Sequence, residues 1–282
     1  MRWSRGVEAP VAEIALAGLS KLYGGDAKAA HALIAEGLDK AAILERTGCN
    51  VALRGIDLAL PSGAISVIMG LSGSGKSTLL RCLIRLIDPT SGAIRFDGED
   101  ITRLDLPALR AFRRRHVGMV FQNFALLPHR TVLQNAAFGL TLHGVKRREA
   151  EARGAAWLEK LGLGGYERAY PQALSGGMRQ RVGLARALAC DLDVLLMDEA
   201  FSALDPLIRA DLQELLLDLQ AELGKTIVFV THDIHEALRL GNHITVMRDG
   251  RIEQAASPAT LLGAPASDYV ARFVEQARGQ VR

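Results

Sequence analysis

Short, almost wholly apolar runs recur along this chain. They occupy residues 65–70, 117–122, 193–198 and 226–232. Apolar runs of this length are typical of strands that are buried on both faces of a parallel sheet. Amphipathic stretches separate the runs, so the pattern predicts an α/β domain with a largely parallel sheet.

Other segments follow a helical pattern. Residues 77–87 continue as a helix from a glycine-rich loop. Residues 123–190 are almost wholly helical in pattern, which predicts a helical subdomain inserted into the sheet. Residues 26–48 predict two short helices, divided at Gly37 and closed by Gly48. A surface addition without a role in function is the simpler interpretation of that segment.

The C-terminal part has a different pattern. Residues 243–254 predict a β-hairpin, because Asp249 and Gly250 form a typical two-residue turn between apolar runs. The tail that follows predicts one or two helices.

Composition narrows the class of protein. The chain has 282 residues, 49% of them hydrophobic and 23% charged, which is ordinary for a domain with a buried core. No apolar run approaches the about 18 residues that span a bilayer, so no transmembrane segment is predicted. Glu8 and Glu13 lie where a signal peptide needs an unbroken apolar core. We therefore expect a cytosolic protein that does not enter a membrane by itself.

Charge and cysteine usage add two further expectations. The formal net charge of +3 is too small to predict a nucleic-acid partner. Cys49, Cys82 and Cys190 lack the spacing of metal ligands, so we expect three small buried hydrophobic residues in a reducing compartment.

A glycine-rich motif indicates phosphate binding. Residues 70–77 fit the P-loop pattern Gly-x4-Gly-Lys-Ser, between a predicted strand and a predicted helix as the motif requires. The glycines let the backbone curl around phosphate oxygens, Lys76 offsets phosphate charge, and the Ser77 hydroxyl can ligate Mg²⁺. A chance match to the pattern is the alternative. The expected nucleotide-binding residues here are Gly70, Leu71, Ser72, Gly73, Ser74, Gly75, Lys76, Ser77 and Thr78.

Two adjacent acids follow the apolar run at 193–197. Asp198 is placed to hold a magnesium ion, and Glu199 to polarise an attacking water. Solvated loop residues would be the plain alternative. Together with the P-loop, these acids indicate a nucleotide hydrolase of unspecified kind.

The stretch LSGGMRQRVGLARAL at residues 174–188 narrows the prediction. It resembles the signature motif of ATP-binding cassette (ABC) ATPases, with Met178 in the fifth place of the usual LSGGQ. The resemblance covers essentially residues 12–277. It implies a P-loop NTPase with a RecA-like core and a parallel sheet, an antiparallel β subdomain and an inserted helical subdomain.

Four further residues resemble motifs of the same family. Gln122 resembles the Q-loop glutamine, Asp205 ends a stretch like the D-loop, and His232 resembles the switch histidine. Tyr23 resembles the aromatic residue that stacks on adenine. Taken singly, Tyr23 could be a core tyrosine, Gln122 a surface amide and His232 a histidine at a strand end.

The resemblance divides the chain into three parts. Residues 1–12 are expected to be an N-terminal extension, and residues 13–255 the nucleotide-binding domain. That domain would contain the two-helix insertion at 26–48 and the helical signature subdomain at 123–190. Residues 256–282 would be a C-terminal helical tail.

The resemblance also implies a shared reaction centre that binds ATP and Mg²⁺. Two such cassettes pair head to tail, so that Ser175, Gly176 and Gly177 of one chain face the P-loop of the other. Within one chain, Ser77, Gln122 and Asp198 would organise Mg²⁺. Glu199 would be the general base, His232 the sensor of the γ-phosphate, and Lys76 a further catalytic cation.

The sequence between the motifs resembles one branch of the family. Segments such as LLMDEAFSALDPLIR at 195–209 resemble ATPase subunits of bacterial importers for glycine betaine, proline betaine, L-proline and choline. This implies a homodimer that powers import at the cytoplasmic face of the inner membrane. Its partners would be two transmembrane permease subunits and a periplasmic solute-binding protein.

Alternatives to this branch stay open at the level of sequence. Many of its members continue into a C-terminal pair of modules related to cystathionine β-synthase domains, and we expect this chain to lack that pair. Another amino-acid importer, such as one for histidine, would use the same ATPase. A soluble cassette ATPase in DNA repair or translation, and a subunit that does not hydrolyse ATP, are further alternatives.

Overall fold

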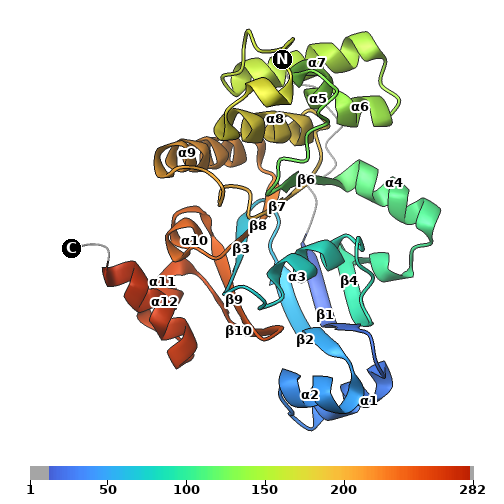
Figure 1. The fold of residues 1–282 in the computed structure, drawn as a ribbon, viewed down its shortest axis with the longest axis vertical. Helices are drawn as coiled ribbons and strands as arrows, with labels where there is room; N and C mark the ends of the chain where they lie inside the picture. The colour runs from blue at the N-terminus through green and yellow to red at the C-terminus, as the bar shows by residue number, and fades with distance from the viewer. Residues whose placement is uncertain (1–12, 280–282) are drawn as a thin grey trace.

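The computed structural model of the chain describes residues 13–279, and the extension predicted at 1–12 lies outside them. Two sheets and an outlying group of helices follow one another along the long axis of the molecule (Figure 1). The strands are β1 (Ile14–Tyr23), β2 (Asn50–Leu60), β3 (Ile65–Met69), β4 (Ser91–Phe96), β5 (Glu99–Asp100), β6 (Val117–Phe121), β7 (Val194–Asp198), β8 (Thr226–Thr231), β9 (His243–Arg248) and β10 (Arg251–Ala256). The α-helices are α1 (Ala27–Ala35), α2 (Lys40–Thr47), α3 (Lys76–Leu83), α4 (Leu106–His116), α5 (Val132–Ala136), α6 (Phe138–Leu142), α7 (Arg147–Lys160), α8 (Gly176–Leu188), α9 (Pro206–Leu223), α10 (Ile234–Leu240), α11 (Pro258–Gly263) and α12 (Asp268–Gly279). Short 3₁₀ turns lie at Ile101–Arg103 and Pro171–Ala173.

The larger sheet is six-stranded, in the order β10-β9-β3-β8-β7-β6. Strands β9, β3, β8, β7 and β6 are parallel, and β10 pairs antiparallel with β9. The four predicted apolar runs form β3, β6, β7 and β8, and the predicted hairpin forms β9 and β10. The predicted α/β class with a largely parallel sheet is therefore confirmed.

Helices cover both faces of this sheet because successive side chains of a strand point to opposite faces. Val67, Met69 and Phe229 belong to a core shared with α8, α9, α10 and α12. Ile68 and Val228 belong to a second core, shared with α3 and the smaller sheet. Strands buried on both sides explain the continuous apolar runs in the sequence.

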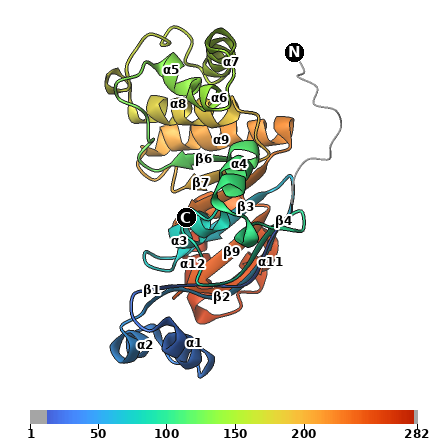
Figure 2. The same ribbon diagram turned by 90° about the vertical axis from the view of Figure 1, so that its right-hand side faces the viewer.

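The smaller sheet is antiparallel, in the order β2-β1-β4-β5. Helices α1 and α2 connect β1 to β2 and project beyond the end of this sheet (Figure 2). Asp26 caps the start of α1, and Gly48 ends α2 with a φ of 68°. Ala30 and Ile43 bury the facing sides of the two helices against Cys49. Segment 26–48 thus forms a helical pair with a small core of its own.

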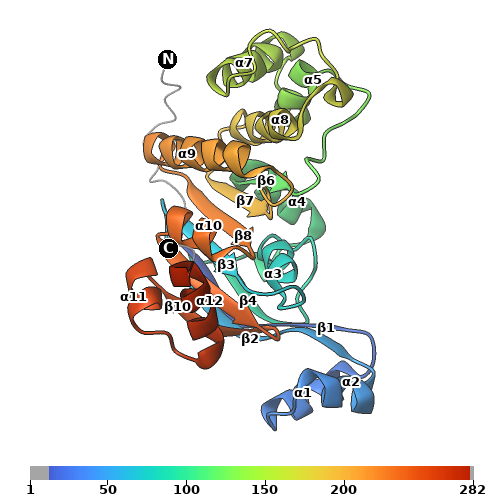
Figure 3. The same ribbon diagram turned by 60° about the vertical axis from the view of Figure 1, so that its left-hand side comes forward.

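Helices α5 to α8 group together at the opposite end of the molecule (Figure 3). They lie between β6 and β7 in the sequence and occupy most of segment 123–190. The buried side of α8 packs against the large sheet and α9. This group of helices therefore lies next to the edge of the parallel sheet that β6 forms.

The cysteines follow the prediction in two cases out of three. Cys49 and Cys82 are buried, and burial raises the pKa of the Cys82 thiol to about 11. The prediction is wrong for Cys190, which is only partly buried. It lies just after the end of α8, where the chain turns at the surface.

The helices of residues 13–279 do not reach the combination of length and apolar character that crossing a bilayer requires.

We predict that Leu196→Ala lowers the free energy of unfolding by about 2–5 kcal/mol, because it opens a cavity in the core. Leu196 is fully buried at the centre of β7, whereas Leu207 is 80% exposed. Leu207→Ala is the control and should change the same quantity by less than about 0.5 kcal/mol. Urea unfolding followed by circular dichroism measures both, and equal losses in the two variants would contradict the assigned core.

Candidate active site

Parallel pairing brings four loops to one edge of the large sheet. Met69 at the end of β3 pairs with Thr231 at the end of β8. Asp198 at the end of β7 pairs with Val230 of β8 and with Phe121 at the end of β6. The residues that follow these strands therefore lie together, as expected at the carboxyl edge of a parallel sheet.

The loop after β3 has a conformation that requires glycine at two positions. Gly70 and Gly75 have φ values of 150° and 104°. A Cβ atom at Gly70 would lie 2.3 Å from the Met247 carbonyl oxygen, and one at Gly75 would lie 2.6 Å from that of Ala52. Both distances are shorter than any real contact, so the loop can follow this path only with glycine there.

The polar side chains of this loop differ in their protein partners. The Lys76 ammonium donates hydrogen bonds to the carbonyl oxygens of Gly70 at 2.8 Å and Leu71 at 3.0 Å. Burial lowers the pKa of Lys76, and the charges of Glu199 and Asp198 oppose that shift. The Ser74 hydroxyl is buried and has no hydrogen-bond partner among the described residues. Buried polar atoms without partners are costly, so this loop is suited to a polar ligand.

Ser77 and Asp198 form a pair of oxygen donors. The Ser77 hydroxyl donates a hydrogen bond of 2.8 Å to Asp198 Oδ1. The other carboxylate oxygen, Oδ2, lies 3.5 Å from Arg81 Nη2. A hydroxyl beside a carboxylate provides the oxygen ligands that Mg²⁺ prefers.

Glu199 and His232 form a second pair. The Glu199 carboxylate lies 3.3 Å from His232 Nδ1, and the backbone N–H of Glu199 donates to the Val230 carbonyl at 3.1 Å. Glu199 has a φ of 46°, so its backbone leaves β7 in the left-handed region. The turn and the hydrogen bond fix where this carboxylate lies relative to the P-loop.

Gln122 is hydrogen-bonded to the loop that follows β7. Its amide donates a 3.2 Å hydrogen bond to the Ser202 hydroxyl, which in turn donates to the Glu199 carbonyl at 2.9 Å. Among the described residues Gln122 makes no hydrogen bond to Ser77 or Asp198, and it is connected to Glu199 through Ser202.

A cavity of about 310 Å³ joins the P-loop to the smaller sheet. Tyr23, 40% exposed, lines it at the end of β1, so the structure brings this residue to the P-loop across the intervening insertion. Lys21 Nζ lies 4.8 Å from the centre of the Tyr23 ring. The cavity is lined by Tyr23, Lys40, Asn50, Val51, Ala52, Ser72, Gly73, Gly75, Lys76, Ser77, Thr78 and Glu199.

The signature residues lie elsewhere. Ser175 caps α8 by accepting a 3.3 Å hydrogen bond from the Met178 N–H. A Cβ atom at Gly177 would lie 2.4 Å from Ile208 Cγ2, so this glycine also lets α8 approach α9. As the described residues form it, the cavity at the P-loop has no lining residue from 175–177. Asp205 is not part of that lining either, and its side chain caps α9 by accepting from the Ile208 N–H at 3.1 Å.

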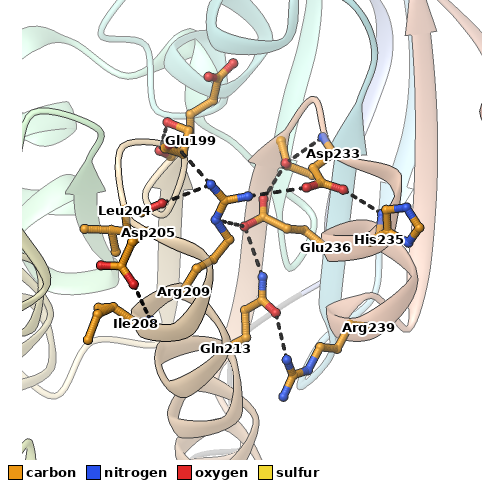
Figure 4. A network of polar contacts seen from close by, with 12 residues as sticks. Glu199, Leu204, Asp205, Ile208, Arg209, Gln213, Asp233, His235, Glu236 and Arg239 are labelled. Atoms are coloured by element: carbon orange, nitrogen blue, oxygen red, sulfur yellow. Dashed lines mark hydrogen bonds and ion pairs between the residues drawn. The ribbon is translucent and has the colours of Figure 1, made fainter. Parts of the chain in front are cut away.

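An ion-pair network that the sequence did not reveal lies beside the site (Figure 4). Arg209 donates to the Leu204 carbonyl at 3.1 Å, and its guanidinium also lies 3.5 Å from the Asp233 carboxylate. Glu236 is a buried residue of α10 whose carboxylate accepts a 2.6 Å hydrogen bond from the Thr231 hydroxyl. Burial raises the pKa of Glu236. The network connects the loop that contains Asp205 with Thr231, the residue before His232.

Other contacts with the site were also missed. Tyr269 of α12 bridges the P-loop and β9, because its hydroxyl accepts from the Leu71 N–H and donates to the Met247 carbonyl, both at 3.4 Å. Arg81 follows Ser77 by four residues on α3, a spacing that could have indicated their proximity. No spacing in the sequence predicts the contact of Tyr269 with Leu71 or that of Arg209 with Asp233.

Comparisons with known proteins show which family the chain belongs to. The sequence model of the family described as ABC transporter matches residues 53–202. The glycine betaine transport ATP-binding protein OpuAA of Bacillus subtilis (strain 168) is 53% identical over 257 residues, covering 91% of this chain and 62% of that protein. The glycine betaine/proline betaine transport system ATP-binding protein ProV of Salmonella typhimurium (strain LT2) is 51% identical over 255 residues, covering 90% and 64%. The chain therefore spans less than two thirds of the length of these two relatives.

A solved structure has the same fold. A dimeric ATP-binding cassette in a post-hydrolysis state, bound to ADP and Pi, matches with a TM-score of 0.73 and 32% sequence identity. The match covers 87% of this chain and 98% of that chain. The family match, the relatives and the fold confirm the resemblance seen in the sequence: the chain belongs to the ABC transporter family and has the fold of an ATP-binding cassette.

Proposed function

We propose that this chain is the ATP-hydrolysing subunit of a binding-protein-dependent importer for a compatible solute. The candidate solutes are glycine betaine, proline betaine, L-proline and choline. The cavity in which the P-loop meets Glu199 is the observation that carries the ATPase role. The names of the relatives, at 51–53% identity, support glycine betaine and proline betaine among these solutes.

The chain's own groups fit a nucleotide with Mg²⁺. Lys76 and the backbone of residues 73–78 would bind the phosphates, and the buried Ser74 hydroxyl supplies one more polar group. Ser77 and Asp198 would hold Mg²⁺, whose bound charge would offset that of the phosphates. Gln122 would contribute to this site only after leaving its hydrogen bond with Ser202. Tyr23 would stack on the adenine.

Glu199 and His232 would carry the hydrolytic step. The Glu199 carboxylate would accept the proton of the attacking water while the water oxygen bonds to the terminal phosphorus. His232, 3.3 Å from that carboxylate, would orient it and contact the terminal phosphate. Glu199 and His232 each directly follow a strand of the large sheet, β7 and β8, so their backbones lie together at its carboxyl edge.

The site would be completed by a second copy of the chain. Ser175, Gly176 and Gly177 do not line the cavity of their own P-loop, and the start of α8 presents backbone N–H groups of the kind that bind anions. In a head-to-tail homodimer these groups would bind the γ-phosphate held by the partner. ATP would then hold the dimer closed, and hydrolysis would release it.

The remaining partners would be two transmembrane permease subunits and a periplasmic solute-binding protein that acts through them. The chain would work as a peripheral subunit at the cytoplasmic face of the inner membrane. This arrangement is supported by the relatives, which are named as ATP-binding proteins of transport systems.

Glu199→Gln tests the hydrolytic role. It keeps the size of the side chain and removes the base, so Mg²⁺-dependent phosphate release should fall by at least about 10²-fold while ATP binding persists. Glu214→Gln, at an exposed position on α9, is the control and should leave turnover unchanged. Substantial turnover in Glu199→Gln would refute the role of this residue.

Ser175→Asp tests the shared site. Aspartate also caps helices, so α8 should remain stable while the new charge repels a phosphate. In the Glu199→Gln background we expect ATP to induce a dimer, seen by light scattering, and Ser175→Asp to abolish it. Ser257→Asp, at the serine cap of α11, is the matched control and should still dimerise. A dimer that persists with Ser175→Asp would contradict the shared site.

Uptake in cells tests the solute class. Deleting the gene should reduce uptake of at least one radiolabelled solute among glycine betaine, proline betaine, L-proline and choline. The wild-type gene should restore that uptake, and the Glu199→Gln variant should not. Loss of histidine uptake alone would overturn the proposed solute class and leave the ATPase role intact.

A further inference from the structure

Lys40 brings a charged side chain from the insertion to the P-loop cavity. It is the first residue of α2, and it lines the same cavity as Tyr23, Lys76 and Ser77. Tyr23 and Asn50, which precede and follow the insertion, pair with each other across β1 and β2 and line the cavity too. The helical pair is therefore anchored at the rim of the candidate site.

The surroundings of Lys40 leave its charge poorly compensated. The side chain is half-buried, and burial lowers the pKa of Lys40, while the charge of Asp249 opposes the shift. Within residues 13–279, the Lys40 ammonium makes no hydrogen bond and no ion pair. An ammonium that has lost part of its water and has no close partner favours a nearby anion.

The charges of the residues that line the cavity also favour an anionic ligand. Its charged lining residues are Lys40, Lys76 and Glu199, so the lining carries a net positive charge only because of Lys40. The ammonium of Lys76 already donates to two backbone carbonyls. All three donors of the Lys40 ammonium therefore remain available to a ligand, whereas Lys76 has one left.

We propose that the Lys40 ammonium binds the phosphates of the nucleotide, which makes the 26–48 insertion a part of the nucleotide site. This inference rests on the proposed ATPase function. It gives a function to the insertion, for which a surface addition without a role was the simpler interpretation of the sequence. The plain alternative is that Lys40 stabilises the fold through the charge of Asp249.

Equilibrium binding to the full chain separates these roles. The probes are fluorescent N-methylanthraniloyl derivatives of ATP and ADP, and the apo protein's melting temperature is measured in parallel. Lys40→Gln should raise the Kd for both nucleotides about tenfold, as expected for loss of a charge-assisted hydrogen bond, without changing that temperature. The difference from wild type should shrink between low and high salt, because partly exposed ion pairs are screened.

Two variants serve as controls. Lys40→Arg keeps the charge and should bind close to wild type. Lys28→Gln removes a lysine from exposed α1 of the same insertion and should not change the Kd.

The outcomes are distinguishable from failure of the proposed function. Wild-type affinity in Lys40→Gln would overturn the role of Lys40 and leave the ATPase role standing. A lower melting temperature of the apo protein, with a loss of affinity that salt does not change, would assign Lys40 to the fold and also overturn the inference. Absence of binding by the wild type would overturn the proposed function itself.

Discussion

The candidate site depends on the parallel register of β6, β7, β8 and β3. Because Phe121, Asp198 and Met69 end their strands at the level of Val230 and Thr231, the loops that follow are neighbours. A shift by one residue would turn every buried side chain of a strand to the other face. The two cores on either side of the sheet therefore fix the register, and the register fixes the distances between the polar residues.

The network around Arg209 adds a second level of constraint. It joins the loop at 202–205, which follows β7, to the start of α10, which follows β8 (Figure 4). The Glu236 carboxylate accepts hydrogen bonds from both Thr231 and Gln213 of α9. The position of His232, which follows Thr231, is therefore coupled to that of α9. The network therefore couples the loop that contains Asp205 to the position of His232.

Local sequence rules predicted much of the fold. These rules predicted the four apolar runs, the hairpin turn at Asp249 and Gly250, and the breaks at Gly37 and Gly48. Each of these features depends on residues that are close together in the chain, so the local sequence pattern is enough to predict it. The order of strands in the sheets and the partial exposure of Cys190 depend on packing between distant segments. Periodicity in the sequence carries no information about such packing.

For the site, the sequence determined which chemical groups are present: the glycine loop with Lys76, the adjacent acids at the end of β7 and the glycines at the start of α8. It could do so because backbone conformation and residue chemistry impose these types at fixed spacing. Only the tertiary structure decided that Gln122 bonds to Ser202, and that Lys40 and Tyr269 reach the P-loop from the insertion and the tail. Those contacts join residues far apart in the chain, and their geometry exists only after the two sheets and their helices have packed together.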